Sequence, residues 1–565
     1  AFFNFAPSLT VSDELILAYL PGIINTNPAK TEKQCRKAKI SPYVLTTADG
    51  GVIIGALREI IVYTTQKKGA ISVKTAHKRR EPIDLTQGPC WKVILLFSLP
   101  VILSYLLQQV YSISDAAIVG QTLSAEEVAG VNDIAPIVNI FLQFAFGVSA
   151  GFCVITSCNV GSHNQPGVRR SLATQIVLSS VLTVLLTGLA LLLLNPMLAW
   201  INVAKDSGAV YTAAFTYCAI IFAGIGAQLF YNFICSFLRA MGDSVTPLVF
   251  LLFSTILNVG LDLLFILSFH WGVAGAAIAT VLAQLISTVG CFLYAFSKYP
   301  ELQLHRPDFA ITKNDITQHI VQGVPLGLQF SVLSIGIITM QSVIVQFDME
   351  AGRIVSSAAQ TGFGAANRLH MLTMTPLNAF GTAMTSFTAQ NLGASKFDRI
   401  RKGSLQAALI MAILCALSMA IGLLMTIDNA YFHIFLSADK ITPETIRYGN
   451  TFLYVDYATY LMLGGIFLMR NCDQGIGRAS YALIAGAAEL VARIVVSTYL
   501  PAAIVGGAVS ASASPLAFYG LCAADPAAWL VADIALGIPF VKNILRQDYS
   551  YLYGEHHRHR ASKAS

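Results

Sequence analysis

Charged residues are scarce in this chain. Lys, Arg, Asp and Glu together make up 12% of its 565 residues, whereas hydrophobic residues make up 55%. A soluble protein carries about 25% charged residues, and the mean hydropathy here is +0.64. This composition excludes a soluble globular protein, because most of the chain must lie in lipid.

Patterns that bind metals or perform catalysis are also missing from the sequence. The ten cysteines are scattered, mostly within apolar runs, and none forms a CxxC pair near histidines. Such cysteines are typical of small buried hydrophobic residues. No motif places a His, Ser or Cys beside a base. We therefore expect no enzyme activity, no metal site, no cofactor and no nucleic-acid partner.

The first 88 residues lack a membrane span. Their longest apolar stretch, residues 15–24, is shorter than the ~20 residues that a transmembrane helix needs, and it contains Pro21. No basic region precedes an apolar one, so no signal peptide is indicated. With 12 Lys and Arg against 7 Asp and Glu, residues 1–88 are expected to form a small, basic cytoplasmic appendage. The basic residues 546–565 are expected to form a solvated cytoplasmic tail.

Long apolar runs begin at Trp91 and predict an all-α membrane protein with twelve transmembrane helices. We expect these helices over residues 91–119, 133–159, 171–194, 209–237, 246–269, 273–296, 316–347, 357–391, 404–426, 446–470, 480–500 and 526–545. The last helix is expected to start where Asp525 can cap it and Pro526 occupies its first turn. Residues 501–524 are then expected to form an outer loop with a re-entrant or interfacial segment.

Two stretches that lie 232 residues apart have nearly the same sequence. Asn159-Val160-Gly161 recurs as Asn391-Leu392-Gly393, and each copy ends an apolar run and opens a basic loop. A duplicated membrane core is typical of secondary transporters, whose halves rock about a central site. Because each half has six helices, both halves enter the membrane from the same side. We therefore expect two lobes, 89–300 and 301–545, related by a pseudo-two-fold axis along the membrane normal.

Basic residues are distributed unevenly over the loops between the predicted helices. One alternate set of loops holds twelve Lys and Arg, with Arg239 and Arg470 among them, and the opposite set holds four. Because basic loops stay on the cytoplasmic side, the first set and both termini are expected in the cytoplasm. The expected location is the plasma membrane, with the chain as a monomer in the lipid bilayer.

Polar residues of the first half are predicted to meet at one depth. Asn258 and Asp262 lie four residues apart on one helix face. At 1.5 Å per residue, Asp115 lies roughly 8 Å from the outer end of its helix, and Asp262 and Thr280 each lie roughly 12 Å from theirs. A lone carboxylate at such a depth costs several kcal/mol and tends to take up a proton or a cation. We expect a cation-coupling site here, against the alternative of a structural hydrogen bond near a helix end.

The second half places charges of both signs within predicted helices. Glu489 precedes Arg493 by four residues, the favourable order for an intrahelical ion pair. We expect these two residues to pair, and the spacing leaves open whether the pair is structural or also handles protons. Arg368 is another intramembrane cation, and Asp456 is its candidate partner.

Several segments together resemble the multidrug and toxic compound extrusion (MATE) family of cation-coupled antiporters. The resemblance covers about residues 91–545 and rests on these motifs: Leu99-Pro100, Gln108-Gln109-Val110-Tyr111, Asp115-Ala116-Ala117-Ile118-Val119-Gly120, Phe237-Leu238-Arg239-Ala240-Met241-Gly242-Asp243, Leu257-Asn258-Val259-Gly260-Leu261-Asp262, Ala389-Gln390-Asn391-Leu392-Gly393-Ala394 and Glu489-Leu490-Val491-Ala492-Arg493-Ile494. It implies V-shaped lobes and the export of amphipathic organic cations or drugs in exchange for H⁺ or Na⁺.

The resemblance also implies roles for single residues. In the family, an Asp on helix 1 and an Asn and an Asp on helix 5 form a cation site, and the matching positions are Asp115, Asn258 and Asp262; Thr280 fits the helix 6 member by spacing. Some members carry a Glu on helix 7, where this chain has Leu333. This departure favours the first lobe as the coupling site.

Gln108 and Tyr111 are expected to line the substrate cavity, with Glu489 and Arg493 either beside it or in a structural pair. The alternative function is a flippase for a lipid-linked oligosaccharide, which can share this lobed architecture. A cavity for diphosphate lipids should contain several buried basic residues, whereas this core offers mainly Arg368 and a paired Arg493. A cationic or zwitterionic cargo is therefore favoured.

Overall fold

The computed structural model describes residues 82–201, 203, 208–299 and 302–549. The predicted appendage, apart from its last residues, and most of the predicted tail lie outside the described residues. The predicted boundary between the lobes, at residues 300 and 301, also lies outside the described residues and remains a prediction. The description below concerns the helical unit that begins at Glu81.

The first half of this unit, here called the N-lobe, contains six helical segments. They are α4 (Cys90–Thr122), α5 (Ala125–Gly161), α6 (Gln165–Trp200), the bent pair α7 (Ala209–Ala223) and α8 (Ile225–Ala240), α9 (Val245–Asp262) with the π-helical turn η3 (Leu263–Ser268), and α10 (Gly272–Lys298). Ser124 caps α5 by accepting a hydrogen bond from the Glu127 backbone N–H, and the Glu127 side chain completes the capping box.

The second half, here called the C-lobe, repeats this order. It contains α11 (Lys313–Gln346), α12 (Ala358–Gly393), α13 (Phe397–Thr426) with η6 (Ile427–Asn429) and α14 (Ala430–Phe435), the bent pair α15 (Pro443–Ala458) and α16 (Tyr460–Gly475), α17 (Ala479–Val505), and α18 (Pro515–Cys522), α19 (Ala524–Pro539) and η8 (Phe540–Leu545). Short connecting elements are η5 (Arg306–Phe309), η7 (Ala438–Lys440) and an antiparallel hairpin of β1 (Met349–Glu350) and β2 (Arg353–Ile354).

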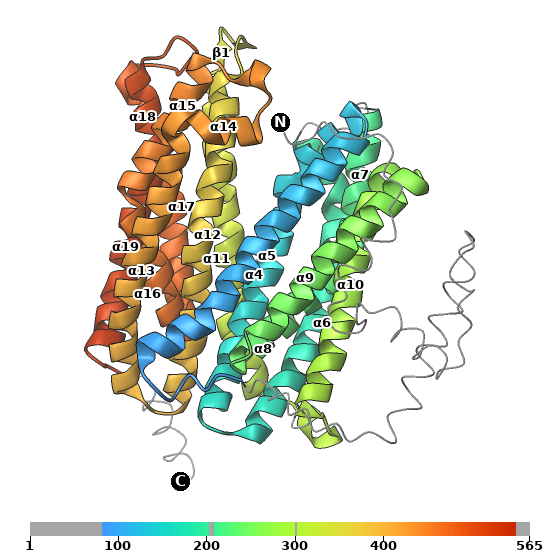
Figure 1. Ribbon diagram of the computed structural model, residues 1–565, viewed down its shortest axis with the longest axis vertical. Coiled ribbons are helices and arrows are strands. Elements are labelled where there is room, and N and C mark those ends of the chain that lie inside the picture. Colours follow the sequence, from blue (N-terminus) through green and yellow to red (C-terminus); the bar gives the residue numbers. More distant parts are fainter. Residues whose placement is uncertain (1–81, 202, 204–207, 300–301, 550–565) are drawn as a thin grey trace, which may run out of the picture. The chain divides into compact units, whose positions relative to one another are not determined.

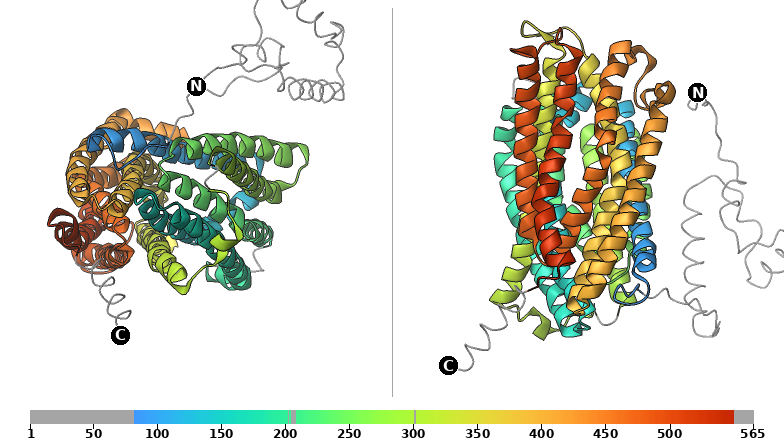
Figure 2. Two further views of the ribbon diagram at one scale, coloured as in Figure 1. Left: turned by 90° about the horizontal axis from the view of Figure 1, so that it is seen from below. Right: turned by 90° about the vertical axis from the view of Figure 1, so that its left-hand side faces the viewer.

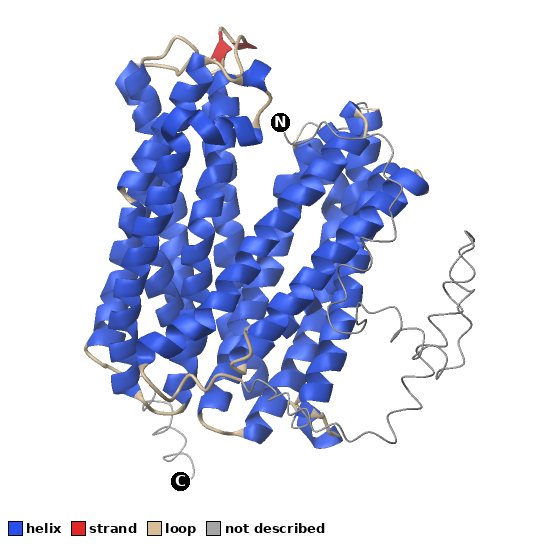
Figure 3. Cartoon of the chain, in the orientation of Figure 1, coloured by secondary structure: helices blue, strands red, loops and turns tan. Residues whose placement is uncertain are grey.

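The prediction of an all-α membrane protein with twelve transmembrane helices is confirmed. Apart from one short hairpin, the described elements are helices (Figure 3). In the described part of the chain, nine helices are long and apolar enough to span a membrane, and the two bent pairs raise the number to eleven. The bends are 45° between α7 and α8 and 55° between α15 and α16. The twelfth helix is α12, which is more polar because one of its faces borders the cavity between the lobes.

Several predicted helix boundaries are wrong: α5 begins at Ala125 rather than 133, α6 spans Gln165–Trp200 rather than 171–194, and α13 begins at Phe397 rather than 404. Two further differences affect residues at the cavity. Helix 10 was expected to end at residue 470, but α16 continues to Gly475, and the chain turns at Gly477 with φ +81°. Helix 12 was expected to start near Pro526, but α18 already begins at Pro515, so the outer loop shrinks to residues 506–514. Pro526 sits in the first turn of α19, where its missing N–H breaks no hydrogen bond. Asp525 does not cap this helix, because its carboxylate binds Arg493 instead.

The lobes approach each other at one end of the bundle. The helices converge toward the end that carries the loops 162–164, 241–244 and 394–396, here called the basic end, and diverge toward the β1–β2 hairpin (Figure 1). Seen end-on, the two lobes lie side by side (Figure 2). Between them, α11 packs along α5, and α12 packs against α4 and α5.

The duplicated motif meets itself at the basic end. A Cβ atom built on Gly161 would overlap the carbonyl of Gln390, and one built on Gly393 would overlap the carbonyl of Cys158. Only glycine permits such an approach of two helix backbones. Gly161 corresponds to Gly393 in the repeat, and Cys158 corresponds to Gln390. The two contacts are therefore equivalent, as a two-fold relation between the lobes requires.

Candidate functional site

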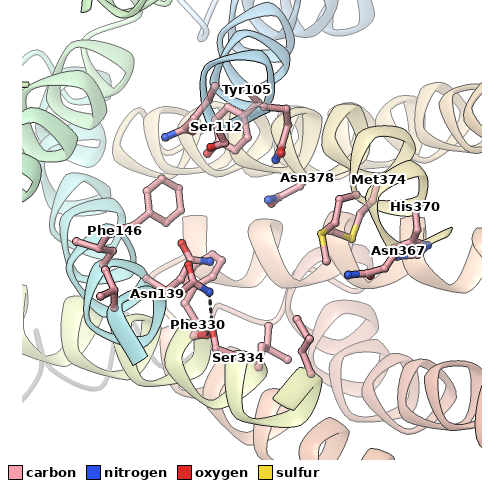
Figure 4. A pocket seen from close by; sticks show the side chains of 18 of the residues that line it. Tyr105, Ser112, Asn139, Phe146, Phe330, Ser334, Asn367, His370, Met374 and Asn378 are labelled. Atoms are coloured by element: carbon pink, nitrogen blue, oxygen red, sulfur yellow. Dashed lines mark hydrogen bonds between the residues drawn. The ribbon is translucent and has the colours of Figure 1, made fainter. Parts of the chain in front are cut away.

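A cavity of about 630 Å³ lies between the two lobes. Its wall mixes polar and apolar side chains from both of them (Figure 4). Phe146 and Phe330 meet edge to face with ring centroids 5.3 Å apart, and the Asn139 amide donates to the Ser334 hydroxyl at 3.4 Å. Carboxamide side chains are frequent in the wall: Gln108, Gln109, Asn139, Gln143, Gln228, Asn232, Gln284, Asn367 and Asn378.

The structure brings the four predicted coupling residues together in the N-lobe. The Asn258 amide donates to the Thr280 hydroxyl at 3.4 Å, and Asn258 and Asp262 are both fully buried. Asp115 and Thr280 line the cavity. The Asp262 side chain lies behind this wall and interacts with the Asp115 carboxyl group.

Asp262 has no hydrogen-bond donor of its own among the described residues. Neither of its carboxylate oxygens accepts a hydrogen bond, and one oxygen of Asp115 is likewise buried without a donor. Two neighbouring carboxyl groups cannot both carry a charge in a low-dielectric site without a cation between them. The donor set of carboxylate, amide and hydroxyl oxygens suits a proton or a hard cation such as Na⁺. The π-helical turn η3 begins directly after Asp262.

The other predicted cavity residues lie where the sequence suggested. Gln108 and Tyr111 on α4 border the cavity, as do Glu489 and Arg493 on α17. Leu333 on α11 also borders it, so the helix 7 position that carries a Glu in some family members contributes an apolar side chain here.

Glu489 and Arg493 form an ion pair, but they belong to a larger network. The Glu489 Oε1 atom is 3.2 Å from Arg493 Nη2, and its Oε2 atom is 3.0 Å from Arg470 Nη2. Arg493 Nε is 2.7 Å from Asp525 Oδ1. These four side chains are buried and all border the cavity, so two arginines and two carboxylates alternate on the C-lobe side.

Sequence reasoning missed Arg470 and Asp525 because it assigned each to the end of a helix. Arg470 was placed in a cytoplasmic loop, yet it lies on α16 with 4% of its surface exposed. Arg239 was also placed in a loop, but it lies in the last turn of α8 and donates to Ser236 at 3.1 Å. The pair Gly475 and Gly477, five residues or more after Arg470, was the signal that could have placed the helix end correctly.

The predicted partnership of Arg368 and Asp456 is wrong. Arg368 is exposed on α12, where its guanidinium approaches the Phe435 carbonyl at 3.5 Å. Asp456 is fully buried and lies 3.2 Å from His370 Nδ1. His370 borders the cavity and stacks on Trp529 with ring centroids 6.2 Å apart. The sequence carried no signal for this pair, because its two members come from helices that are distant in the chain.

The fold and the cavity define a multi-pass membrane transporter built from two helical lobes. The MatE sequence family matches residues 100–264 and 333–499. The chain belongs to the MatE family, which confirms the resemblance noted in the sequence.

Three similar proteins illustrate this membership. The probable multidrug resistance protein YpnP of Bacillus subtilis strain 168 is 33% identical over 319 residues, which cover 56% of this chain and 68% of YpnP. The FAD transporter of Shewanella oneidensis strain MR-1 is 23% identical over 416 residues, which cover 72% of this chain and 87% of that protein. An outward-facing structure of a multidrug resistance MATE family transporter of the MOP superfamily shares the fold, with a TM-score of 0.71 and 21% identity over 81% of this chain and 96% of that one.

Proposed function

We propose that this protein is an antiporter that exports amphipathic organic cations or drugs across the plasma membrane, in exchange for H⁺ or Na⁺, by alternating access. The observation that carries the proposal is a pair of neighbouring carboxyl groups: Asp115 lies in the wall of the cavity between the lobes, and Asp262 lies behind it. Neither carboxylate pairs with a described Lys or Arg. The name of YpnP, a probable multidrug resistance protein, supports the same class of cargo.

Cargo export is coupled to ion uptake because the cargo and the ion compete for the negative charge of Asp115 and Asp262. When no cargo is near, the Asp115–Asp262 pair holds a proton or a cation, because two adjacent carboxylates repel each other. Asp115 borders the cavity, where a cationic cargo would meet it. Binding of the ion on one side of the membrane then releases the cargo, and loss of the ion on the other side restores the negative charge that binds it.

The lobe interface suits a rocking motion. At the basic end, the backbone contacts of Gly161 with Gln390 and of Gly393 with Cys158 hold the lobes together. The contacts join the ends of intact helices and depend on glycine, so they can separate without unfolding a helix. In the proposed cycle they break when the cavity opens toward the basic end, and the lobes approach each other at the hairpin end instead.

The cavity wall favours an amphipathic cargo. Aromatic and methionine side chains such as Phe146, Phe330 and Met374 offer apolar contact, and carboxamides offer hydrogen bonds. On the C-lobe side the charges of the two arginines are balanced by Glu489 and Asp525. The N-lobe carboxyl pair is therefore the uncompensated charge, which favours a cationic or zwitterionic molecule.

The flippase alternative receives less support from the same cavity. A diphosphate lipid would need basic side chains that are free to bind phosphate. Arg470 and Arg493 both border the cavity, but each already lies within 3.2 Å of a carboxylate. A diphosphate would have to displace these carboxylates, at the cost of burying them without a partner.

The orientation of the proposed transporter follows from the loops. Arg239 and Arg470 are buried in their helices, but the other ten Lys and Arg of the expected cytoplasmic set lie in loops or helix ends at the basic end, against four on the other side. This bias still favours a cytoplasmic basic end. We also propose that the cavity opens toward the outside of the cell and that the protein is a monomer.

Ion-sensitive cargo binding tests the proposal. Purified protein is titrated with tetraphenylphosphonium, a lipophilic organic cation, in a calorimeter at several pH values with and without Na⁺. We expect affinity to fall as H⁺ or Na⁺ is added. Asp262→Asn should bind the cation without this ion dependence, whereas Asp133→Asn, which neutralises an exposed carboxylate elsewhere on α5, should behave like the wild type. Full ion dependence in Asp262→Asn would remove this residue from the coupling site.

A further inference from the structure

A second cavity, of about 400 Å³, lies on the outer surface at the basic end. It is a groove between the first turn of α4 in the N-lobe and the first turns of α13 in the C-lobe. Its wall includes Gly88, Trp91, Asp398, Arg399, Lys402 and Gln406. The Trp91 backbone N–H donates to the Gln406 side chain at 2.9 Å, which ties the two helices together at the groove.

The groove carries two basic side chains, Arg399 and Lys402, that form no ion pair with a carboxylate of the described residues. Lys402 is exposed and forms no hydrogen bond or ion pair with any residue the structure describes. The Arg399 guanidinium donates to the backbone carbonyls of Leu85, Gln87 and Gly88. Neutral carbonyls fix this guanidinium in place but leave its charge uncompensated. Among the described residues of the wall, one carboxylate, Asp398, stands against two basic side chains, so an anion is the complementary ligand.

The helices beside the groove present an apolar surface suited to acyl chains. On α4, Leu95, Leu96 and Leu99 are 40–57% exposed. On α13, Leu409 and Ile413 are 66% and 52% exposed and continue the ridge that starts at Lys402 and Gln406. These residues belong to two helices that are apolar enough to span a membrane. They therefore face lipid tails rather than water.

Trp91 marks the level of the groove in the bilayer. Its side chain is 51% exposed, and tryptophan gathers at the boundary between headgroups and hydrocarbon. The groove thus lies at headgroup depth, with basic side chains toward water and leucines toward the bilayer centre. Basic pockets between transmembrane helices at this level are suited to anionic lipid headgroups.

We propose that this groove binds an anionic phospholipid, with the headgroup phosphate on Lys402 in the field of Arg399 and the acyl chains along the exposed leucines of α4 and α13. Lys402 supplies the direct hydrogen bonds, because the donors of Arg399 already bind backbone carbonyls. The lipid bridges the two lobes on their membrane-facing side, at the end where they approach each other. The site is separate from the central cavity.

Native mass spectrometry of the full-length protein tests this site. The protein is delipidated in detergent and titrated with phosphatidylglycerol or with phosphatidylcholine of the same acyl chains. We expect one phosphatidylglycerol to bind more tightly than phosphatidylcholine. Lys402→Gln should reduce this preference about five-fold, because one basic residue near an anionic lipid surface contributes about 1 kcal/mol to binding. Arg401→Gln is the matched control, because Arg401 is exposed on the same helix but does not border the groove.

Additional arms separate the lipid site from simpler explanations. Lys402→Arg should keep the preference, which shows that the effect comes from the charge. Glycerol phosphate in millimolar excess should not displace the lipid, because it lacks acyl chains. The proposal is overturned if Lys402→Gln binds phosphatidylglycerol as the wild type does, if Arg401→Gln weakens binding equally, or if glycerol phosphate competes fully. The readout does not depend on transport, so it stands apart from the proposed function.

Discussion

Glu489 is the carboxylate that lies between two arginines, and its neutralisation should destabilise the C-lobe strongly. Its two oxygens are 3.0 Å from Arg470 and 3.2 Å from Arg493. In Glu489→Gln, Arg493 keeps Asp525 at 2.7 Å, but Arg470 is left without a carboxylate within 4 Å among the described residues. Stranding a buried charge in this way costs about 3–5 kcal/mol.

Double substitutions separate the members of the network. Arg470→Gln combined with Glu489→Gln removes the stranded charge and leaves the Arg493–Asp525 pair intact, so it should recover most of the lost stability. Glu489→Gln combined with Arg493→Gln should recover little, because Arg470 and Asp525 are then both unpaired. If Glu489 and Arg493 paired only with each other, as their spacing alone predicts, the second combination would instead recover most of the lost stability.

The assay heats the detergent-purified protein to a series of temperatures and measures the fraction that remains folded by size-exclusion chromatography. We expect the wild type to be the most stable and the Arg470/Glu489 double variant to come next. Glu489→Gln and the Glu489/Arg493 double variant should be the least stable and similar to each other. Arg368→Gln serves as the control for loss of an exposed arginine on α12. If the Glu489/Arg493 double variant proves as stable as the Arg470/Glu489 one, Arg470 is not held by Glu489 and the network is wrong.

Other parts of the structure lead to further predictions. Burial raises the pKa of Asp243 in the 241–244 loop, but hydrogen bonds from Lys298 at 2.7 Å and from two neighbouring hydroxyl groups outweigh it and hold the pKa below its ordinary value of 3.8. A carboxyl group with a lowered folded-state pKa stabilises the protein above about pH 4 and loses this effect as the pH falls further, so Asp243→Asn should flatten the loss of thermal stability between pH 5 and pH 3; an unchanged acid profile would show that the Lys298 contact contributes nothing. Ser162→Cys should resist an impermeant thiol reagent in intact cells and react after permeabilisation, and labelling in intact cells would place the basic end outside. Gly161→Val should force the Gln390 carbonyl away and increase access to the cavity from the basic end, measured by cysteine labelling in inside-out vesicles; unchanged access would mean that this contact does not close the lobes.

The N-lobe site could be predicted from the sequence because its geometry is local. Asn258 and Asp262 lie on one helix face whatever the tertiary packing is. The depth of Asp115 and Thr280 follows from their distance to a helix end. These arguments need no knowledge of which helices are neighbours, and the structure brings the four residues together.

The C-lobe network could be predicted only in part, because most of its contacts cross between helices. Spacing identified Glu489 and Arg493, which share one helix. Arg470 and Asp525 reach them from α16 and α19, and no local pattern states that these helices are adjacent. Both residues also lie near points where the sequence suggested helix ends, so a loop or a cap explained each of them equally well.

Uphill efflux under separately imposed gradients is the direct test of ion coupling through Asp115 and Asp262. Proteoliposomes loaded with ethidium receive either a pH gradient or a Na⁺ gradient, with the membrane potential clamped. We expect one of these gradients to drive ethidium against its own gradient in the wild type and in Asp133→Asn, but not in Asp262→Asn. Failure of both gradients to drive the wild type, or uphill efflux by Asp262→Asn at the wild-type rate, would contradict coupling through the N-lobe carboxyl pair.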